Sequence, residues 1–177
     1  MVTTSFNTDQ EPTAKSIAVV GGGQLVQMLV KAAKLRNIEV NVISPSNEDP
    51  AAQESKTNLV LHPDKLTDQI GVLKDCQGVT FENEWIDISH YCQLEEFGVN
   101  FYPRLSSLHP LINKIKQRQM ICDLNLPCPD WLPLSSEFIG ENKIPNGWEF
   151  PLMAKLAKGG YDGKGTKKIN NYYDLNE

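Results

Sequence analysis

Three consecutive glycines near the start of the chain are the first residues with a possible chemical role. Gly21, Gly22 and Gly23 follow a short β-branched run at 16–20 and precede apolar residues at helical spacing. Backbone N–H groups at such a helix start can bind phosphate or another anion. The dinucleotide fingerprint is incomplete, because Val26 occupies the third glycine position and the strand at 40–43 ends without an acid. The pattern indicates an anion-binding turn, with a tight turn that binds nothing as the alternative.

A second glycine-rich segment lies at residues 158–165, with the sequence K-G-G-Y-D-G-K-G. It is not a Walker loop, because Lys158 and Gly165 stand where glycine and Ser or Thr are required. A glycine-rich hairpin between antiparallel strands can instead cover the phosphates of a nucleotide, with a lysine from a neighbouring strand on the phosphates. Lys155 is suitably placed for that role. The alternative is a flexible hairpin with Lys155 as an ordinary edge-strand lysine.

Two carboxylates follow an apolar strand at 78–81. Glu82 and Glu84 belong to the sequence T-F-E-N-E-W. At the end of a strand they could accept hydrogen bonds from ligand hydroxyls or from an amine. The residues alone favour the alternative, which is a solvated loop.

Strands and helices alternate through the first hundred residues. We expect strands at 16–20, 40–43, 58–61, 78–81 and 99–101, and helices at 24–35, 65–74 and 88–97. This alternation predicts an α/β fold with a parallel sheet and helices on both faces. Ligands of such sheets bind at the carboxyl ends of the strands, so residues 21–24 and residues 82–84 are expected at the same edge.

The pattern changes after residue 103. We expect a helix at about 111–124, capped by Ser106 or Ser107 with Pro110 in its first turn. A strand at 150–156 and a return strand at 166–169 flank the glycine-rich segment. The predicted organisation is a flexible tail at 1–15, an α/β domain at 16–103 and an incomplete second domain at 104–177.

Composition excludes several classes of protein. The chain has 177 residues, with 17 Lys plus Arg and 22 Asp plus Glu, so its net charge is −5. An acidic balance argues against nucleic acid as a partner, and no apolar run approaches the roughly 18 residues that span a membrane. The first fifteen residues lack an apolar core, so we expect a cytoplasmic protein with reduced thiols. The spacing of the four cysteines and three histidines predicts no metal site.

Four segments, in this order, resemble the 5-(carboxyamino)imidazole ribonucleotide synthase family of ATP-grasp carboxylate–amine ligases. The resemblance extends from residue 17 to about residue 170, and the glycine-rich segment is its most specific part. The four segments are G-G-G-Q-L-V-Q-M-L at 21–29, D-P-A-A-Q at 49–53, V-T-F-E-N-E at 79–84 and K-L-A-K-G-G-Y-D-G-K-G at 155–165.

The resemblance implies a pre-ATP-grasp, Rossmann-like domain followed by the start of an ATP-grasp domain. It also implies the family's activity. ATP and bicarbonate give carboxyphosphate, and the amine of aminoimidazole ribonucleotide is carboxylated in purine biosynthesis, with Mg²⁺ on the phosphates and a possible homodimer. The implied ATP-binding residues are Lys114, Lys155, Gly160, Tyr161, Asp162, Gly163, Lys164, Gly165 and Thr166. The implied ribonucleotide-binding residues are Gly22, Gly23, Gln24, Leu25 and Glu82.

The chain departs from the family pattern at several positions. Val26 and Gln27 replace the usual Gly-Arg pair, which weakens substrate binding if that Arg contacts the ribonucleotide. Thr166 stands where Gln is common, and Ser44 replaces an acid that is often present. None of these changes removes the resemblance.

In this family the catalytic domain continues beyond the glycine-rich loop, and that continuation supplies the catalytic residues and the Mg²⁺ ligands. The chain is therefore expected to be an N-terminal portion that is inactive alone. Two alternatives stay open: a ribonucleotide-binding module without catalysis, and a portion of another ATP-grasp ligase such as the formate-using purine transformylase.

Overall fold

The computed structural model describes residues 15–55, 60–84, 86–134, 144, 146–160 and 164–176. The chain divides into two compact units. The first comprises Met1–Asn83 and Asp87–Leu105, and the second comprises Glu84–Ile86 and Ser106–Glu177.

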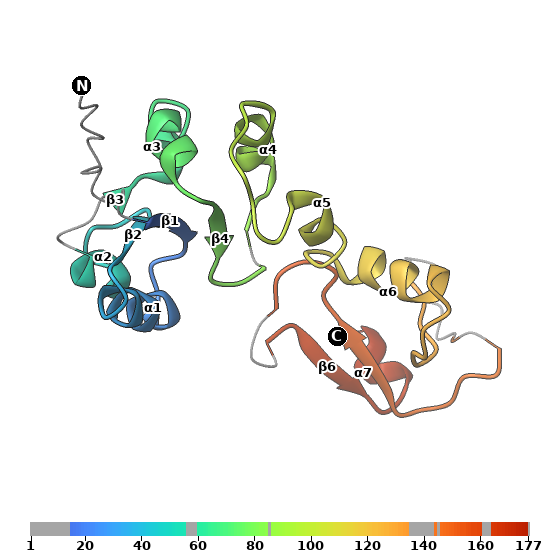
Figure 1. The fold of residues 1–177 in the computed structure, drawn as a ribbon. Helices are drawn as coiled ribbons and strands as arrows, with labels where there is room; N and C mark the ends of the chain where they lie inside the picture. Colours follow the sequence, from blue (N-terminus) through green and yellow to red (C-terminus); the bar gives the residue numbers. More distant parts are fainter. Residues whose placement is uncertain are drawn as a thin grey trace, which may run out of the picture. The chain divides into compact units, whose positions relative to one another are not determined.

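The first unit is built on a parallel four-stranded sheet with the strand order β3-β2-β1-β4 (Figure 1). Its strands are β1 (Lys15–Val20), β2 (Ile38–Ile43), β3 (Val60–Leu61) and β4 (Val79–Phe81). Its helices are α1 (Gln24–Lys34), α2 (Pro50–Glu54), the 3₁₀-helix η1 (Pro63–Lys65), α3 (Ile70–Asp75) and α4 (Ser89–Glu96). Helices α1 and α2 lie on one side of the sheet, and α3 and α4 lie on the other. This arrangement confirms the predicted α/β class with helices on both faces.

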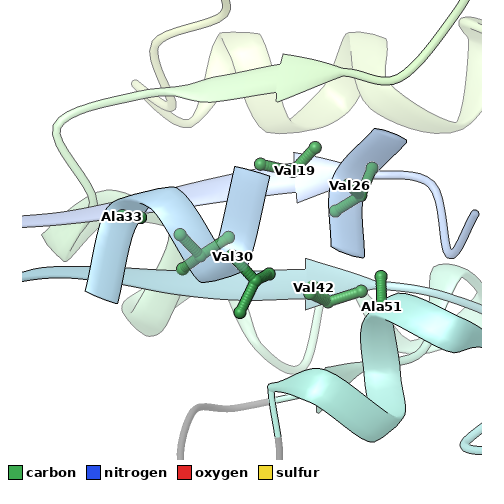
Figure 2. Packing of buried hydrophobic residues seen from close by; sticks show 7 residues of the cluster. Val19, Val26, Val30, Ala33, Val42 and Ala51 are labelled. Atoms are coloured by element: carbon green, nitrogen blue, oxygen red, sulfur yellow. The ribbon is translucent and has the colours of Figure 1, made fainter. Parts of the chain in front are cut away.

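The core beneath α1 consists of small branched side chains. Val26, Val30 and Ala33 recur at intervals of four and three residues, which places them on one face of the helix. Figure 2 shows this face against β1 and β2, with Ala51 of α2 completing the cluster. Full burial of a valine side chain contributes roughly 1.5–3 kcal/mol, so this contact fixes the position of the start of α1 over the sheet.

Three aromatic rings join β4 to the helix that follows it. The ring of Phe81 meets Tyr91 edge-on at 5.8 Å between centroids and stacks on Phe101 at 5.9 Å. Burial, followed by the charge of Asp87, raises the pKa of Tyr91 to about 12. The cluster therefore holds the carboxyl end of β4 against α4.

The second unit contains an antiparallel hairpin. Its elements are α5 (Leu105–Leu108), which begins at the last residue of the first unit, α6 (Lys114–Asp123), β5 (Leu152–Lys155), β6 (Thr166–Ile169) and α7 (Tyr172–Asn176). β5 pairs with β6, as the sequence predicts. The Asp174 carboxylate accepts hydrogen bonds from the backbone N–H and side-chain amide of Asn170 at 2.8 and 3.0 Å, and these bonds lower its pKa. They join α7 to the end of β6.

The helix predicted at 65–74 is wrong in its first half. Residues 66–69 form turns, because Asp68 and Gln69 donate to the carbonyls of Lys65 and Leu66 in tight i to i+3 bonds. The α-helical hydrogen bonding begins only at Ile70. The apolar spacing is still used, since Leu66 and Leu73 are both buried.

The helix predicted at 111–124 starts later than expected. Residues 105–108 form the short helix α5, and the chain turns through His109-Pro110 before α6 begins at Lys114. A proline disfavours the helical conformation of the residue before it, which here is His109. Asn113 rather than a serine caps α6, and its side-chain oxygen accepts from the N–H groups of Ile115 and Lys116 at 2.9 and 3.2 Å.

Some predicted strands are shorter than expected. The strand expected at 99–101 contributes a single parallel bridge between Phe101 and Val79. The strand expected at 150–156 pairs only over Leu152–Lys155. Helices α2 and α7 were not predicted, because five residues are too few to show helical periodicity.

Candidate functional site

The glycine turn connects the carboxyl end of β1 to the start of α1. Gly21 has φ +133°, a conformation that side-chain-bearing residues rarely adopt. Its N–H donates to the carbonyl of Ile43, the last residue of β2, at 3.0 Å. The turn is therefore held at the edge of the sheet where the parallel strands end.

Glu82 closes this turn from the neighbouring strand. Its backbone N–H donates to Val20 at 2.8 Å, and its Oε2 accepts the N–H of Gly23 at 3.0 Å. A Cβ atom on Gly21 would lie 2.5 Å from Cβ of Glu82, and one on Gly23 would lie 2.5 Å from its Oε1. The glycines thus make room for the half-buried Glu82 side chain, and the prediction that turn and Glu82 share an edge is confirmed.

This contact changes the chemistry expected of the turn. The carboxylate accepts the Gly23 N–H, one of the N–H groups at the helix start that were predicted to bind an anion. The first N–H groups of α1 beyond it have no acceptor within the helix. The edge therefore presents a fixed carboxylate, which accepts hydrogen bonds from hydroxyl or amine groups, next to the helix N–H donors.

Ser44 and Asp49 lie on the other side of the turn, and neither residue was predicted to have a role at the site. A Cβ atom on Gly22 would meet both side chains, and the Ser44 hydroxyl donates to the Asp49 carboxylate. The N–H of Ala51 donates to the Gly22 carbonyl at 3.0 Å. An Asp-Pro pair at a helix start is the signal that could have located Asp49, since Asp49 is the N-cap residue of α2.

The next residues of α1 divide between surface and core. The side chains of Gln24 and Leu25 are exposed, and their backbone N–H groups belong to the first turn of α1. Val26 is 2% exposed and belongs to the core cluster of Figure 2. Valine thus fills the space between α1 and the sheet at the position where a dinucleotide fingerprint has glycine.

In the second unit, the β5–β6 hairpin brings predicted ATP-binding residues together. Lys155 pairs with Thr166 across the hairpin, and paired residues share one face of a sheet. Both side chains are exposed. Beyond this pair the N–H of Leu156 donates to the carbonyl of Gly165 at 2.8 Å, so the strands remain joined where the glycine-rich loop begins.

Two glycines pack against each other at the base of this loop. Gly160 and Gly165 have φ +77° and +74°. A Cβ atom on Gly160 would lie 2.6 Å from the Lys164 carbonyl, and one on Gly165 would lie 2.7 Å from Leu156. Lys164 is exposed and has an interaction partner. Tyr161, Asp162 and Gly163 lie outside the described residues.

The start of α6 is attached to the same segment. The N–H of Lys114 donates to the carbonyl of Ala157 at 2.8 Å, two residues beyond Lys155. Lys114 is therefore hydrogen-bonded to the segment that follows Lys155, so two of the three lysines predicted to bind ATP lie on connected segments of the second unit.

Among the residues that the structure describes, no group of three or more His, Cys, Asp or Glu side chains could hold a metal ion. No helix in the described part of the chain is long and apolar enough to cross a membrane.

The family comparison agrees with the fold of the first unit. Residues 14–110 match the family model of the ribonucleotide synthetase preATP-grasp domain.

Curated relatives match this chain over part of their length. The chain is 35% identical over 171 residues to N5-carboxyaminoimidazole ribonucleotide synthase of Synechocystis sp., covering 93% of this chain and 41% of that protein. It is 32% identical over 161 residues to the enzyme of that name from Synechococcus elongatus, covering 91% and 40%. The chain thus spans about two fifths of the length of these relatives.

A solved structure extends the likeness across both units. Carboxyaminoimidazole ribonucleotide synthase of Aspergillus clavatus, complexed with ATP, matches with a TM-score of 0.71 and 25% identity, over 92% of this chain and 43% of that one. The resemblance drawn from the four motifs and the predicted fold class are confirmed. The chain belongs to the ribonucleotide synthetase family that carries the pre-ATP-grasp domain.

Proposed function

We propose that this chain belongs to an ATP-dependent ligase that carboxylates aminoimidazole ribonucleotide with bicarbonate. The sheet edge with the glycine turn and Glu82 would bind the ribonucleotide, and the second unit would supply part of the ATP site. The product would be N5-carboxyaminoimidazole ribonucleotide, with release of ADP and phosphate. The observation that carries the proposal is the Gly23 N–H to Glu82 Oε2 bond of 3.0 Å at the edge where the parallel strands end. Gly23 and Glu82 both belong to the segment 14–110 that matches the preATP-grasp domain.

At this edge the proposal assigns two kinds of contact to the ribonucleotide. Glu82 accepts hydrogen bonds from its hydroxyl or amine groups, because an ionised carboxylate only accepts. Gly22, Gly23, Gln24 and Leu25 contribute close backbone approach and helix N–H donors to its anionic end. A side chain at Gly22 would occupy the space that Ser44 and Asp49 now fill, and a side chain at Gly23 would occupy that of Glu82.

In the second unit the proposal assigns the triphosphate to the hairpin. Lys155 and Lys114 supply positive charge, and residues 160–166 cover the phosphates. Support comes from the pairing of Lys155 with Thr166 and from the bond between Lys114 and Ala157. Fixed cations that neutralise developing charge lower the barrier of phosphoryl transfer.

The proposal assigns no Mg²⁺ ligand to the described residues, among which no group of three or more His, Cys, Asp or Glu side chains could hold a metal ion. No step of the proposal is routed through the metal, and its ligands are assigned to parts of the full ligase beyond these residues. The chain by itself is proposed to be inactive. Bicarbonate as co-substrate, a homodimer and a cytoplasmic location come from the family resemblance and are part of the same proposal.

The experiment that tests this function uses a chimera in which the remaining three fifths of the Synechococcus elongatus relative follows the aligned end of this chain. ADP release is measured with aminoimidazole ribonucleotide and bicarbonate. We expect release that requires both compounds, and none from the 177-residue chain alone. Far-UV circular dichroism establishes that both proteins are folded.

Three outcomes would contradict the proposal. Turnover by the chain alone would refute its inactivity. Formate replacing bicarbonate would favour the transformylase alternative. Binding of the ribonucleotide by a folded chimera that releases no ADP would favour a module without catalysis.

A further inference from the structure

Two cysteine thiols lie side by side in the second unit, in a place that the proposed ligase chemistry does not use. The Sγ atoms of Cys122 and Cys128 are 3.7 Å apart. Cys122, in the last turn of α6, is exposed, and Cys128 is half-buried. A disulfide requires about 2.0 Å between the sulfur atoms, so an approach of about 1.7 Å would bring them to bonding distance.

The end of α6 explains why these thiols meet. Asn125 has φ +52°, its N–H donates to Cys122 at 2.9 Å, and the N–H of Leu126 donates to Ile121 at 3.0 Å. These two bonds and the left-handed residue form a Schellman motif, which reverses the chain after a helix. The reversal returns Cys128 to the turn that carries Cys122.

Neighbouring residues restrict the pair further. Pro127 and Pro129 flank Cys128 and limit the backbone conformations on both sides of it. The indole N–H of Trp131 donates to Sγ of Cys122 at 3.3 Å. The two thiols are thus arranged by backbone and side-chain contacts together, without a covalent bond.

We propose that Cys122 and Cys128 form a dithiol modification site that a low-molecular-weight disulfide oxidises to an intramolecular disulfide. In the first step the Cys122 thiolate attacks the reagent, forms a mixed disulfide and releases one thiolate. In the second step the Cys128 thiolate attacks Sγ of Cys122 and expels the other half of the reagent. Two protein thiols are oxidised, one reagent disulfide is reduced to two thiols, and the two protons pass to the released thiolates.

The environment of the pair is consistent with this order. Partial burial raises the pKa of the Cys128 thiol, and its contact with Cys122 and the charge of Asp130 raise it further, while Arg118 opposes them. Because the thiolate is the nucleophile, a raised pKa slows attack on reagent from solution. Proximity compensates in the second step, which is intramolecular. The exposed Cys122 is therefore the thiol that reacts first.

The test uses the reduced 177-residue chain with oxidised glutathione as the probe, followed by alkylation with iodoacetamide and digestion with trypsin. Cleavage after Arg118 and Lys143 places both thiols in the peptide 119–143. We expect this peptide with an internal disulfide, two hydrogen atoms lighter than the reduced peptide and without alkyl groups. In denaturant the disulfide-bonded fraction should fall, because the Schellman motif no longer holds the thiols together.

Two matched variants distinguish a disulfide between Cys122 and Cys128 from the independent reaction of an exposed thiol. Cys128→Ser should leave a glutathione mixed disulfide on Cys122, since the second thiol is missing. Cys92→Ser removes another exposed thiol and should leave the internal disulfide unchanged. The proposal is overturned if the native chain gives peptide 119–143 with two alkyl groups or two glutathiones, or if denaturant leaves the disulfide fraction unchanged.

A spectroscopic readout checks the same bond in the intact chain. Oxidation should change the tryptophan emission, because the indole of Trp131 contacts Sγ of Cys122. Trp131→Phe should abolish most of this change while the disulfide still forms. An equal emission change in that variant would contradict the assigned position of the bond.

Discussion

Glu82 shows at the scale of single residues how an ambiguous carboxylate acquires a defined position. Its local sequence favours a solvated loop, whereas its Oε2 accepts the N–H of Gly23, which lies 59 residues earlier in the chain. Local sequence could not reveal this bond, because it depends on β4 pairing with β1. Topological reasoning about strand ends did place Glu82 and the turn at the same edge.

Asp49 illustrates the opposite case at the same scale. The strand before it ends without an acid, so the residues at the strand end predict no carboxylate on that side of the glycine turn. The chain returns through residues 45–49, and Asp49 accepts from the Ser44 hydroxyl beside Gly22. A carboxylate thus reaches the turn from a loop, which strand-end spacing does not detect.

Lys155 allows a test of the proposed triphosphate site by substitution. Lys155→Ala in the chimera should weaken ATP binding about tenfold or more, because a hydrogen bond to a charged group is worth about 1.5–3 kcal/mol. Calorimetric titration with ATP gives the dissociation constant.

Lys167→Ala is the matched control for this titration. Lys167 pairs with Ala154 and therefore belongs to the opposite face of the hairpin from Lys155. Its substitution should leave ATP affinity unchanged. Equal affinities of wild type and Lys155→Ala would contradict the role given to Lys155.

At the scale of elements, the glycine turn is predictable from sequence, but the helix boundaries are not. A β-branched run, three glycines and a helical apolar pattern together identify β1, the turn and α1. The start of α6 depends instead on Asn113, whose side chain caps the helix after the break at Pro110. Ser106 and Ser107 are as favourable as Asn113 by residue type, so residue type alone could not identify which of the three caps the helix.

Two glycine substitutions test the strain assigned to the turn. Gly21→Ala should lower the free energy of unfolding by about 1–3 kcal/mol, because alanine disfavours the left-handed region and its Cβ would lie 2.5 Å from Cβ of Glu82. Gly71→Ala, in α3, should raise it by about 0.5–1 kcal/mol, because its Cβ would meet no atom within 4 Å.

Urea denaturation followed by circular dichroism measures both changes under the same conditions. Opposite signs are the expected outcome. If the two variants shift the midpoint alike, the conformation and close contact assigned to Gly21 are incorrect.

At the scale of the whole molecule, sequence motifs were more informative than length or charge. Their order indicated a family, and residues 14–110 match its domain. The net charge of −5 argued only against nucleic acid as the main partner. The two groups of proposed site residues belong to different compact units, the glycine turn with Glu82 to the first and the hairpin with Lys114 to the second. Binding of aminoimidazole ribonucleotide can therefore be tested separately from binding of ATP.

A calorimetric titration of the 177-residue chain with aminoimidazole ribonucleotide tests the proposed ribonucleotide site at Glu82 most directly. Binding should be measurable at millimolar ligand and should weaken about tenfold in Glu82→Gln, because an ionised acceptor makes stronger hydrogen bonds than a neutral one. Glu39→Gln, near the start of β2 and thus at the opposite edge of the sheet, should bind like wild type. The absence of binding heat at millimolar ligand, or equal affinity of wild type and Glu82→Gln, would contradict the ribonucleotide site assigned to this edge.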